Sequence, residues 1–328
     1  MPLKLVSIGG GTGLSTLLEG LRPVVSADSS PVELTAIVTV TDDGNSSGRL
    51  RREFSIPPPG DIRNCLVALA PNQEGLAALF RHRFPGTGAL GGHALGNLLL
   101  LALFQMEGDL SRAIDAARSI LGIRARVLPS TTDPVDLLAR VGGEWVRGQV
   151  AIKSHPGRIE ELQLSPPDRQ ALPAALTAIR EADLITLGPG SLFTSIVANL
   201  VVPGVVPALA ASRARKIFIC NAMTEFDETE GFSAVDHLRA VLGYAPGVKI
   251  DHALFNSSSI SPRMRERYAI ERAVALNPPA QHPPDLAGID FLSLPLASES
   301  RFVRHDPERL RQAVLGLAKV SDCVGDEL

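Results

Sequence analysis

The feature that most constrains this chain is a cluster of glycines directly after its first apolar run. Residues 3–8 are mostly apolar, glycine occupies positions 9, 10, 11 and 13, and a helix-like run from Leu14 to Leu21 follows. Glycine lets the backbone turn sharply and approach a ligand closely, and the first N–H groups of a helix carry a positive partial charge. The pattern predicts a buried strand, a tight turn and a helix N-terminus that binds phosphate or another anion.

Two known phosphate-binding motifs match this cluster only in part. The dinucleotide motif G-x-G-x-x-G needs a glycine at position 14 when it begins at Gly9, where the chain has Leu14, and the Walker motif needs Gly-Lys-Ser/Thr. The dinucleotide motif also expects an acidic residue about 20 positions further on. Here Asp42 follows Gly11 by 31 positions (42 − 11). These departures disfavour an NAD site, and a turn that binds no ligand is the alternative interpretation.

Composition restricts the class of protein. With 328 residues, 45% hydrophobic residues and a mean hydropathy of +0.15, the chain can build a sizeable core. A net charge of −3 provides no field that attracts nucleic acid. The three cysteines share no metal or redox spacing, which favours a reducing, cytoplasmic compartment. The N-terminus does not resemble a secretion signal, and the apolar run Ile196–Ala211 carries two prolines, so we expect no membrane span.

Apolar β-rich runs alternate with helix-like segments along most of the chain. After residues 3–8, expected strands cover Leu34–Val40, Asp183–Leu187 and Lys216–Cys220. Expected helices cover Leu14–Arg22, a segment from about Ile62, a segment ending at Phe104, Ala171–Arg180, Ser233–Leu242 and Glu308–Lys319. The alternation predicts an α/β fold whose mainly parallel sheet carries helices on both faces. We expect residues 1–328 to form a single domain.

The alternation is interrupted over about residues 125–170. Short strand-like runs occur there at Ala125–Leu128, Glu144–Arg147 and Val150–Lys153, with a glycine pair as a turn. We expect a small β-rich insertion on the main sheet.

Polar or glycine-rich clusters follow at least four of the expected strands, after Ile8, Val40, Leu187 and Cys220. Ends of this kind lie on one edge of a parallel sheet, where open α/β folds bind their ligands. One crevice lined by several strand ends follows from this arrangement.

Five segments of the chain together resemble one family. They are Ile8–Gly13, Thr41–Arg51, Pro59–Asn64, Gly92–Asn97 and Leu187–Ser195. On these residues the chain resembles the YvcK/CofD-like family over about Leu3 to Lys319, and it is most similar to the gluconeogenesis-factor (YvcK) branch. The resemblance implies a Rossmann-like three-layer fold, a nucleotide ligand and a cytosolic homodimer.

The two branches of this family imply two different functions. The YvcK branch is implied to bind UDP-sugars, notably UDP-N-acetylglucosamine, and to act in control of cell shape and the cell wall on gluconeogenic carbon. The CofD branch is a transferase that moves a 2-phospholactyl group from a GDP-activated donor to a deazaflavin precursor of coenzyme F420. The segments 41–51 and 59–64 favour the YvcK branch. Whether the chain catalyses a reaction stays open, because no nucleophile–base pair is visible in the sequence.

The expected nucleotide-binding residues come from the strand ends and from positions that resemble UDP-sugar contacts. They are Gly9, Gly10, Gly11, Thr12, Gly13, Asp42, Asp43, Ser46, Ser47, Arg49, Asp61, Arg63, Asn64, His93, Asn97, Gly188, Pro189, Gly190, Ser191, Thr194, Ser195, Asn221, Thr224, Tyr268 and Arg304. Asp42 and Asp43 are also the candidate ligands of Mg²⁺, which would bridge a diphosphate. Their alternative role is a solvated Asx turn.

Several of these residues have a structural alternative. Asp61 could cap the helix that begins near Ile62, and Arg49 could be a surface cation. His93 and Asn97 share one helix face because they are four residues apart, and both could be satisfied within the fold. The hydroxyls of the second glycine turn could cap their own helix, which is compatible with anion binding there.

Two departures from the family's usual pattern concern loops. Asn45 replaces a glycine after the acidic pair, and a short polar side chain tolerates the left-handed backbone that such a turn needs. Phe226 and Asp227 replace a Pro-Gly turn, which leaves the conformation of that loop open, while Glu228 and Thr229 are retained.

Overall fold

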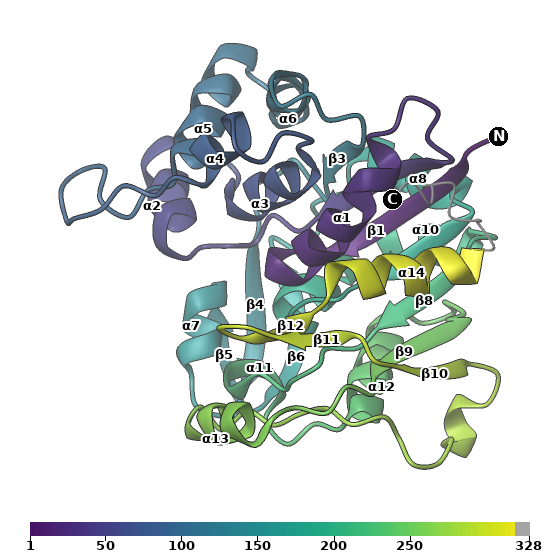
Figure 1. Cartoon of the computed structure of the whole chain (residues 1–328). Coiled ribbons are helices and arrows are strands. Elements are labelled where there is room, and N and C mark those ends of the chain that lie inside the picture. The colour runs from purple at the N-terminus through teal and green to yellow at the C-terminus, as the bar shows by residue number, and fades with distance from the viewer. Residues whose placement is uncertain (319–328) are drawn as a thin grey trace.

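The computed structural model describes residues 1–318 and contains a seven-stranded sheet at its centre (Figure 1). The strand order is β10-β9-β8-β7-β1-β2-β3, and every neighbouring pair is parallel. The strands are β1 (Leu3–Gly9), β2 (Val32–Val38), β3 (Arg126–Pro129), β7 (Leu184–Leu187), β8 (Arg215–Ile219), β9 (His252–Asn256) and β10 (Asp290–Leu294). The predicted α/β architecture with a parallel sheet is confirmed.

The order of the strands reverses direction between β1 and β7. The chain builds β1, β2 and β3 towards one edge, and then β7, β8, β9 and β10 towards the other. Gly9 therefore ends β1 beside the end of β7, where Ile8 pairs with Leu187. Such a topological switch point leaves a crevice at the carboxyl ends of the strands. Both glycine-rich turns of the sequence begin there.

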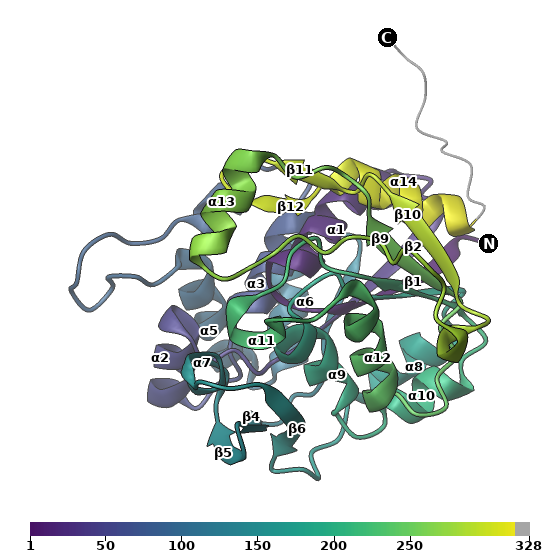
Figure 2. The same ribbon diagram turned by 90° about the horizontal axis from the view of Figure 1, so that it is seen from below.

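Helices cover both faces of the sheet, as Figure 2 shows from below. One face carries α1 (Gly11–Val25), α3 (Gly60–Leu69), α6 (Leu110–Ile120) and α14 (Pro307–Ala318). The other face carries α8 (Pro173–Glu181), the π-helix η1 (Leu192–Val197), α9 (Ala198–Leu200), α10 (Val205–Ala211) and α12 (Ala234–Tyr244). This arrangement is the predicted three-layer fold.

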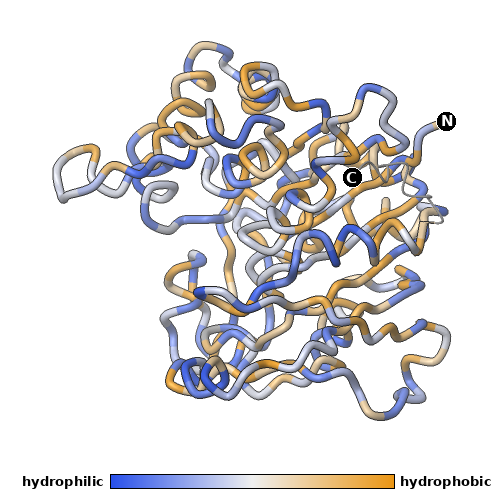
Figure 3. The backbone as a smooth tube through the Cα atoms, in the orientation of Figure 1, coloured by the Kyte–Doolittle hydropathy of each residue, from blue (hydrophilic) through white to orange (hydrophobic). Residues whose placement is uncertain are grey.

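The core lies between these layers. The strands form orange stretches through the centre of Figure 3, because their residues are buried on both faces. Leu5, Ile8 and Leu187 are fully buried, as is Leu14 at the start of the first helix. Leu14, which breaks the dinucleotide motif, is thus a core residue.

The remaining helices of the N-terminal half are α2 (Asn45–Phe54), α4 (Leu76–Arg81) and α5 (Leu95–Glu107). They pack against α3 or, in the case of α2, against α5. Asn45 begins α2 with φ +39°, so the short polar side chain does accept a left-handed backbone. The loop between α4 and α5 projects from the body of the molecule (Figures 1 and 2).

The expected β-rich insertion needs two corrections. A separate three-stranded antiparallel sheet consists of β4 (Asp136–Val141), β5 (Glu144–Arg147) and β6 (Ile159–Ser165). The run Ala125–Leu128 does not belong to it, because β3 joins the main sheet beside β2. The run Val150–Lys153 is not a strand but most of helix α7 (Gln149–Ser154), which follows a left-handed Gly148.

Other expected boundaries shift by a few residues. Helix α1 begins at Gly11 rather than Leu14, because the glycines form its first turn. The expected strand Leu34–Val40 begins and ends two residues earlier. The last helix ends at Ala318 in the structure, and Lys319 lies outside the described residues.

The C-terminal segment contains elements that the sequence did not indicate. Besides β9 and β10 these are α11 (Phe226–Thr229), α13 (Pro262–Ile270), the 3₁₀-helix η2 (Pro284–Leu286) and the hairpin β11 (Ala297–Glu299) with β12 (Val303–His305). The hairpin lies beside α13 and α14 in both ribbon views (Figures 1 and 2). Within residues 1–318 no single helix is long and apolar enough to cross a membrane; only the bent pair Leu192–Leu200 and Val205–Ala211 could, by length and composition alone.

Candidate functional site

A cavity of about 290 Å³ opens at the switch point between β1 and β7. Its walls come from the start of α1, the turn after β7, the segment after β8, helix α13 and the strand β12. The lining residues are Gly10, Gly11, Thr12, Gly13, Thr16, Pro189, Gly190, Ser191, Ser195, Asn221, Ala222, Met223, Thr224, Glu225, Tyr268, Val303, Arg304 and His305. The structure thus brings twelve of the expected binding residues into one cavity.

The two glycine turns touch each other through their backbones. A Cβ atom at Gly13 would lie 2.5 Å from the Pro189 carbonyl oxygen and 2.5 Å from the Gly190 Cα. Only glycine permits this approach, since real Cβ atoms do not come so close to backbone atoms. Gly11 has φ +59°, in the left-handed region. The glycine density is therefore explained by a turn and a close contact between two strand ends.

The N-terminus of α1 offers hydrogen-bond donors to this cavity. The first hydrogen bond of the helix runs from the Leu14 N–H to the Gly10 carbonyl. The Thr12 and Gly13 N–H groups have no acceptor among residues 1–318, and both residues line the cavity. Two unpaired N–H groups at the start of a 15-residue helix form a place suited to an anion.

Asp61 lies at the same helix start. Burial, and next the charge of Asp42, raise the pKa of the Asp61 carboxyl to about 7, while a hydrogen bond from the Gly11 backbone opposes that rise. A Cβ atom at Gly10 would lie 2.8 Å from an Asp61 carboxylate oxygen. Asp61 makes no cap for its own helix α3, whose N-cap residue is Pro59. Its side chain instead lies against the first glycine turn.

The two residues of the acidic pair face different elements. One Asp42 oxygen accepts the Gly44 N–H at 3.0 Å, an Asx turn, and the other lies near Gly60 and Ser47. Asp43 accepts the Val150 N–H at 2.9 Å, at the start of α7. Asp42 therefore faces Gly60 and acts on the pKa of the adjacent Asp61, whereas Asp43 faces α7.

The carboxylates of Asp42 and Asp61 are a second pair that could hold a divalent cation. Among the described residues no group of three or more His, Cys, Asp or Glu could hold a metal ion. Mg²⁺ commonly takes one or two carboxylates together with ligand phosphates. Asp42 and Asp61 could supply those two carboxylates, because the charge of Asp42 acts on Asp61 and, after burial, contributes to the raised pKa of Asp61. Asp43 lies against the start of α7 instead, where one of its oxygens accepts the Val150 N–H and the other lies beside Gly148.

The second glycine turn is closed by a carboxylate of the chain itself. Glu228 accepts the backbone N–H groups of Phe193 at 2.9 Å and Thr194 at 3.2 Å, and it also accepts the Thr194 hydroxyl. Thr194 and the Glu228 side chain are buried. The start of η1 is thus occupied by Glu228, at the position where the sequence suggested a ligand phosphate.

Lys153 neutralises this buried carboxylate from the three-stranded sheet region. Its Nζ lies 2.9 Å from Glu228 and 3.3 Å from Glu225. Burial lowers the pKa of Lys153, but the two carboxylates outweigh burial and the net pKa is raised. Ser191 donates its hydroxyl to Glu225 at 2.8 Å. Burial and then Glu228 raise the pKa of Glu225, and Lys153 opposes that rise.

The remaining cavity walls hold four further residues of the expected site. The Tyr268 hydroxyl accepts the Val303 N–H at 3.0 Å, which fixes the ring beside β12. The Arg304 guanidinium lies 5.3 Å from the centre of the Phe302 ring. Asn221 accepts the Gly190 N–H at 3.1 Å. Thr224 is buried and accepts the Val274 N–H.

Several expected site residues do not line this cavity. The Ser46 hydroxyl lies 2.9 Å from His93 Nδ1 and accepts the Asn97 amide at 2.9 Å, so these three buried residues bind one another within the fold. His93 precedes α5, so it does not share a helix face with Asn97 as expected. Arg49 donates to the Gly91 and Ala89 carbonyls and holds the projecting loop. Burial, and next Arg83, lower the pKa of Arg63, which donates to its neighbour Asn64. Gly9, Gly188, Ser47 and Thr194 are also outside the lining.

Sequence reasoning missed four residues that shape the site. Glu225 and His305 line the cavity, and Lys153 and Glu228 lie behind its wall. Burial lowers the pKa of His305 to about 4, although a hydrogen bond with the Cys220 backbone opposes this, so its imidazole is neutral. For Glu228 the sequence offers a signal, because this residue is retained in the family's pattern over residues 224–229. Nothing in the sequence indicated that Lys153 reaches this segment.

The fold and the cavity define the class of this protein. It is an α/β protein with a Rossmann-like parallel sheet and a cavity at the switch point, lined by the glycine-rich start of α1. The sequence model described as 2-phospho-L-lactate transferase CofD matches residues 5–289, and the chain belongs to this CofD family.

Curated relatives within this family carry another name. The chain is 42% identical over 314 residues to "Gluconeogenesis factor" of Halalkalibacterium halodurans, covering 95% of both chains. It is 44% identical to "Gluconeogenesis factor" of Bacillus subtilis, over 82% of this chain and 84% of the relative. An X-ray crystal structure of a Bacillus halodurans protein superposes with a TM-score of 0.90 at 40% identity, over 96% of this chain and 100% of that protein. The resemblance and the fold predicted from the sequence are thus confirmed.

Proposed function

We propose that this chain is a cytoplasmic regulatory protein that binds a UDP-sugar, such as UDP-N-acetylglucosamine, in the switch-point cavity. The supporting observation is the pair of unpaired N–H groups at Thr12 and Gly13, which open into the cavity at the start of α1. A diphosphate accepts hydrogen bonds from such groups and gains from the helix dipole. Arg304 lines the same cavity and adds a cation.

The regulatory part of this proposal rests on the relatives. Two of them carry the name gluconeogenesis factor at 42% and 44% identity. We extend that name to control of cell shape and the cell wall during gluconeogenic growth. A homodimer is part of the same proposal, and light scattering of the purified protein would test it.

A ligand panel tests the binding proposal directly. Titration calorimetry with UDP-N-acetylglucosamine, GDP and NAD should give the tightest binding for the UDP-sugar. Tight binding of GDP without measurable heat from the UDP-sugar would contradict the proposal. Binding of NAD alone would instead support a dinucleotide site, despite Leu14.

Arg304 and Arg301 form a matched pair for a variant test. Both guanidinium groups lie over the Phe302 ring, at 5.3 Å and 5.6 Å, but only Arg304 lines the cavity. Arg304→Met should weaken UDP-sugar binding about tenfold or more, because it removes a charged contact with the diphosphate. Arg301→Met should leave the affinity unchanged, and an equal loss in both variants would argue against a contact from Arg304.

A transferase is the second candidate. It is favoured by the description of the matching family and by the neighbouring carboxylates of Asp42 and Asp61. Such a pair could hold a cation that neutralises charge on a leaving phosphate. Incubation with a GDP-activated 2-phospholactyl donor, Mg²⁺ and a deazaflavin acceptor should then give the transfer product. Absence of product with every donor and acceptor would count against this candidate.

A further inference from the structure

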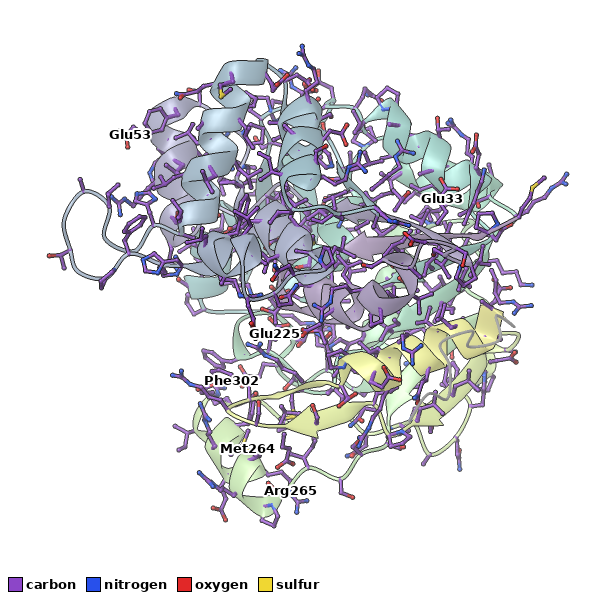
Figure 4. All side chains as sticks on the ribbon, turned by 45° about the horizontal axis from the view of Figure 1, so that its top comes forward. Glu33, Glu53, Glu225, Met264, Arg265 and Phe302 are labelled. Carbon is purple, nitrogen blue, oxygen red and sulfur yellow. The ribbon has the colours of Figure 1, made fainter. Side chains whose placement is uncertain are left out.

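Glu225 is the only acidic side chain in the described lining of the switch-point cavity. It follows β8 and directly precedes α11. Figure 4 labels it in the middle of the molecule, between the helices of the N-terminal half and the C-terminal strands. About a third of the surface of its side chain (34%) is exposed, so the side chain is accessible from the cavity. A half-buried carboxylate in a cavity proposed to bind a nucleotide requires an explanation, because it repels phosphate.

The two oxygens of Glu225 are unequally satisfied. Oε2 accepts the Ser191 hydroxyl at 2.8 Å and the Lys153 ammonium at 3.3 Å. Oε1 accepts only the Asn221 amide, at 3.3 Å, within residues 1–318. A carboxylate offers about four acceptor positions. Oε1 therefore keeps an acceptor position, while Oε2 is fixed by two donors.

The neighbours of Glu225 hold this carboxylate in one orientation. Ser191 and Asn221 both line the cavity, and Asn221 also binds the Gly190 N–H. Lys153 approaches from the opposite side and binds Glu228 as well. Glu225 thus presents an anionic acceptor of fixed position beside the second glycine turn. A hydroxyl group is the donor that complements such an acceptor, as in the acidic residue that binds ribose in dinucleotide folds.

We propose that Glu225 Oε1 accepts a hydrogen bond from a sugar hydroxyl of the ligand, and so orients the sugar while the diphosphate occupies the Thr12–Gly13 side of the cavity. This inference rests on the proposed nucleotide function and names the part of the ligand that is recognised. The hydroxyl can belong to the ribose or to the attached sugar, since both supply the same chemistry. Glu225 is then a specificity-determining residue.

Calorimetry with matched ligands distinguishes these two sources. Wild type and Glu225→Ala are titrated with UDP-N-acetylglucosamine, UDP, 2′-deoxy-UDP and 3′-deoxy-UDP. If the attached sugar is bound, Glu225→Ala weakens UDP-N-acetylglucosamine roughly 10- to 100-fold and leaves UDP unchanged. If the ribose is bound, the variant weakens UDP by the same factor and leaves one deoxy ligand unchanged.

Two further variants keep the test decisive. Glu225→Gln retains an acceptor oxygen and the shape of the side chain, and should recover part of the lost affinity. Glu33→Ala removes an exposed glutamate from β2, far from the cavity in Figure 4, and should change nothing. Equal weakening of all four ligands by both Glu225 variants would overturn the inference in favour of a purely structural role, and so would unchanged affinities. Absence of binding to wild type would overturn the proposed function first, and the inference with it.

Discussion

Lys153 Nζ lies 2.9 Å from a carboxylate oxygen of Glu228, and the Glu228 side chain is fully buried. The two residues belong to different parts of the fold. Lys153 is on α7, which follows the strand β5 of the three-stranded sheet, whereas Glu228 is on α11 after β8. Glu228 in turn binds the first N–H groups of η1. Lys153 therefore connects the region of the three-stranded sheet to the second glycine turn, because it neutralises the carboxylate that binds the start of η1.

Replacing Lys153 by methionine should destabilise the protein strongly. The change leaves Glu228 buried without its cation, and breaking a buried pair in this way costs about 3–5 kcal/mol. Urea unfolding would measure the free energy of unfolding of Lys153→Met. The control is Lys4→Met, which breaks the exposed pair with Glu181 and should cost less than about 1 kcal/mol. Similar losses in both variants would contradict a special role for Lys153.

Gly13→Ala should remove nucleotide binding and lower stability. The added methyl group would lie 2.5 Å from the backbone of Pro189 and Gly190, so the two strand ends must separate. We expect a loss of on the order of 1–3 kcal/mol, typical of overpacking. Gly243→Ala in α12 is the control, because a Cβ there meets open space and alanine favours a helix by about 1 kcal/mol. Full nucleotide affinity in Gly13→Ala would refute the close contact.

The raised pKa of Asp61 predicts a pH dependence of stability. In the folded state this pKa is about 7, above the ordinary aspartate value of 3.8. The folded state therefore binds more protons than the unfolded state between these values, and the free energy of unfolding should fall as pH rises from about 4 to about 7. This fall should amount to on the order of 2–4 kcal/mol in total, and it should be absent in Asp61→Asn. An unchanged profile would show that Asp61 is not responsible.

The same carboxyl predicts a pH dependence of ligand affinity. An ionised Asp61 beside α1 repels a diphosphate, so binding of UDP-N-acetylglucosamine without metal should be tighter at pH 6 than at pH 8. This ligand is suitable because its diphosphate diester does not titrate in that range. Calorimetry in two buffers of different ionisation heat would detect the proton taken up on binding. Equal affinity at both pH values, with no proton uptake, would contradict the prediction.

The central architecture was accessible from sequence because its signals are local. Leu34–Val40 and Asp183–Leu187 are apolar runs that end in polar clusters, and both are strands within two residues of the expected bounds. The hairpin β11–β12 carried no such signal, since its strands have three residues each. The strand assigned to Val150–Lys153 is wrong because a run of four residues that contains two β-branched side chains, Val150 and Ile152, fits a strand or a short helix equally well.

The site was only partly accessible for a different reason. The glycine turns were recognised because their sequence reports a backbone conformation, and Gly11 and Gly13 do require glycine. The partners of Glu228 and Glu225 depend on which segments the fold brings together, and Lys153 is more than 70 positions away in the sequence. A helix N-terminus that attracts an anion also attracts the chain's own carboxylates, as Glu228 shows at η1.

Because Asp42 acts on Asp61 whereas Asp43 faces α7, we expect the isosteric variants Asp42→Asn and Asp43→Asn to differ in how Mg²⁺ affects ligand affinity. Asp42 contributes its charge to the raised pKa of Asp61, whereas Asp43 accepts the Val150 N–H at 2.9 Å. Mg²⁺ should tighten binding of UDP-N-acetylglucosamine in wild type at pH 8, and Asp42→Asn should remove that increment because it removes one of the two carboxylates. Asp43→Asn should keep the increment and lower stability by at most about 0.5 kcal/mol, because the amide oxygen still accepts the Val150 N–H and only the charge at the start of α7 is lost. The affinity with and without Mg²⁺, measured beside the free energy of unfolding, separates the two effects. Loss of the Mg²⁺ increment in Asp43→Asn alone would return the cation site to the adjacent acidic pair.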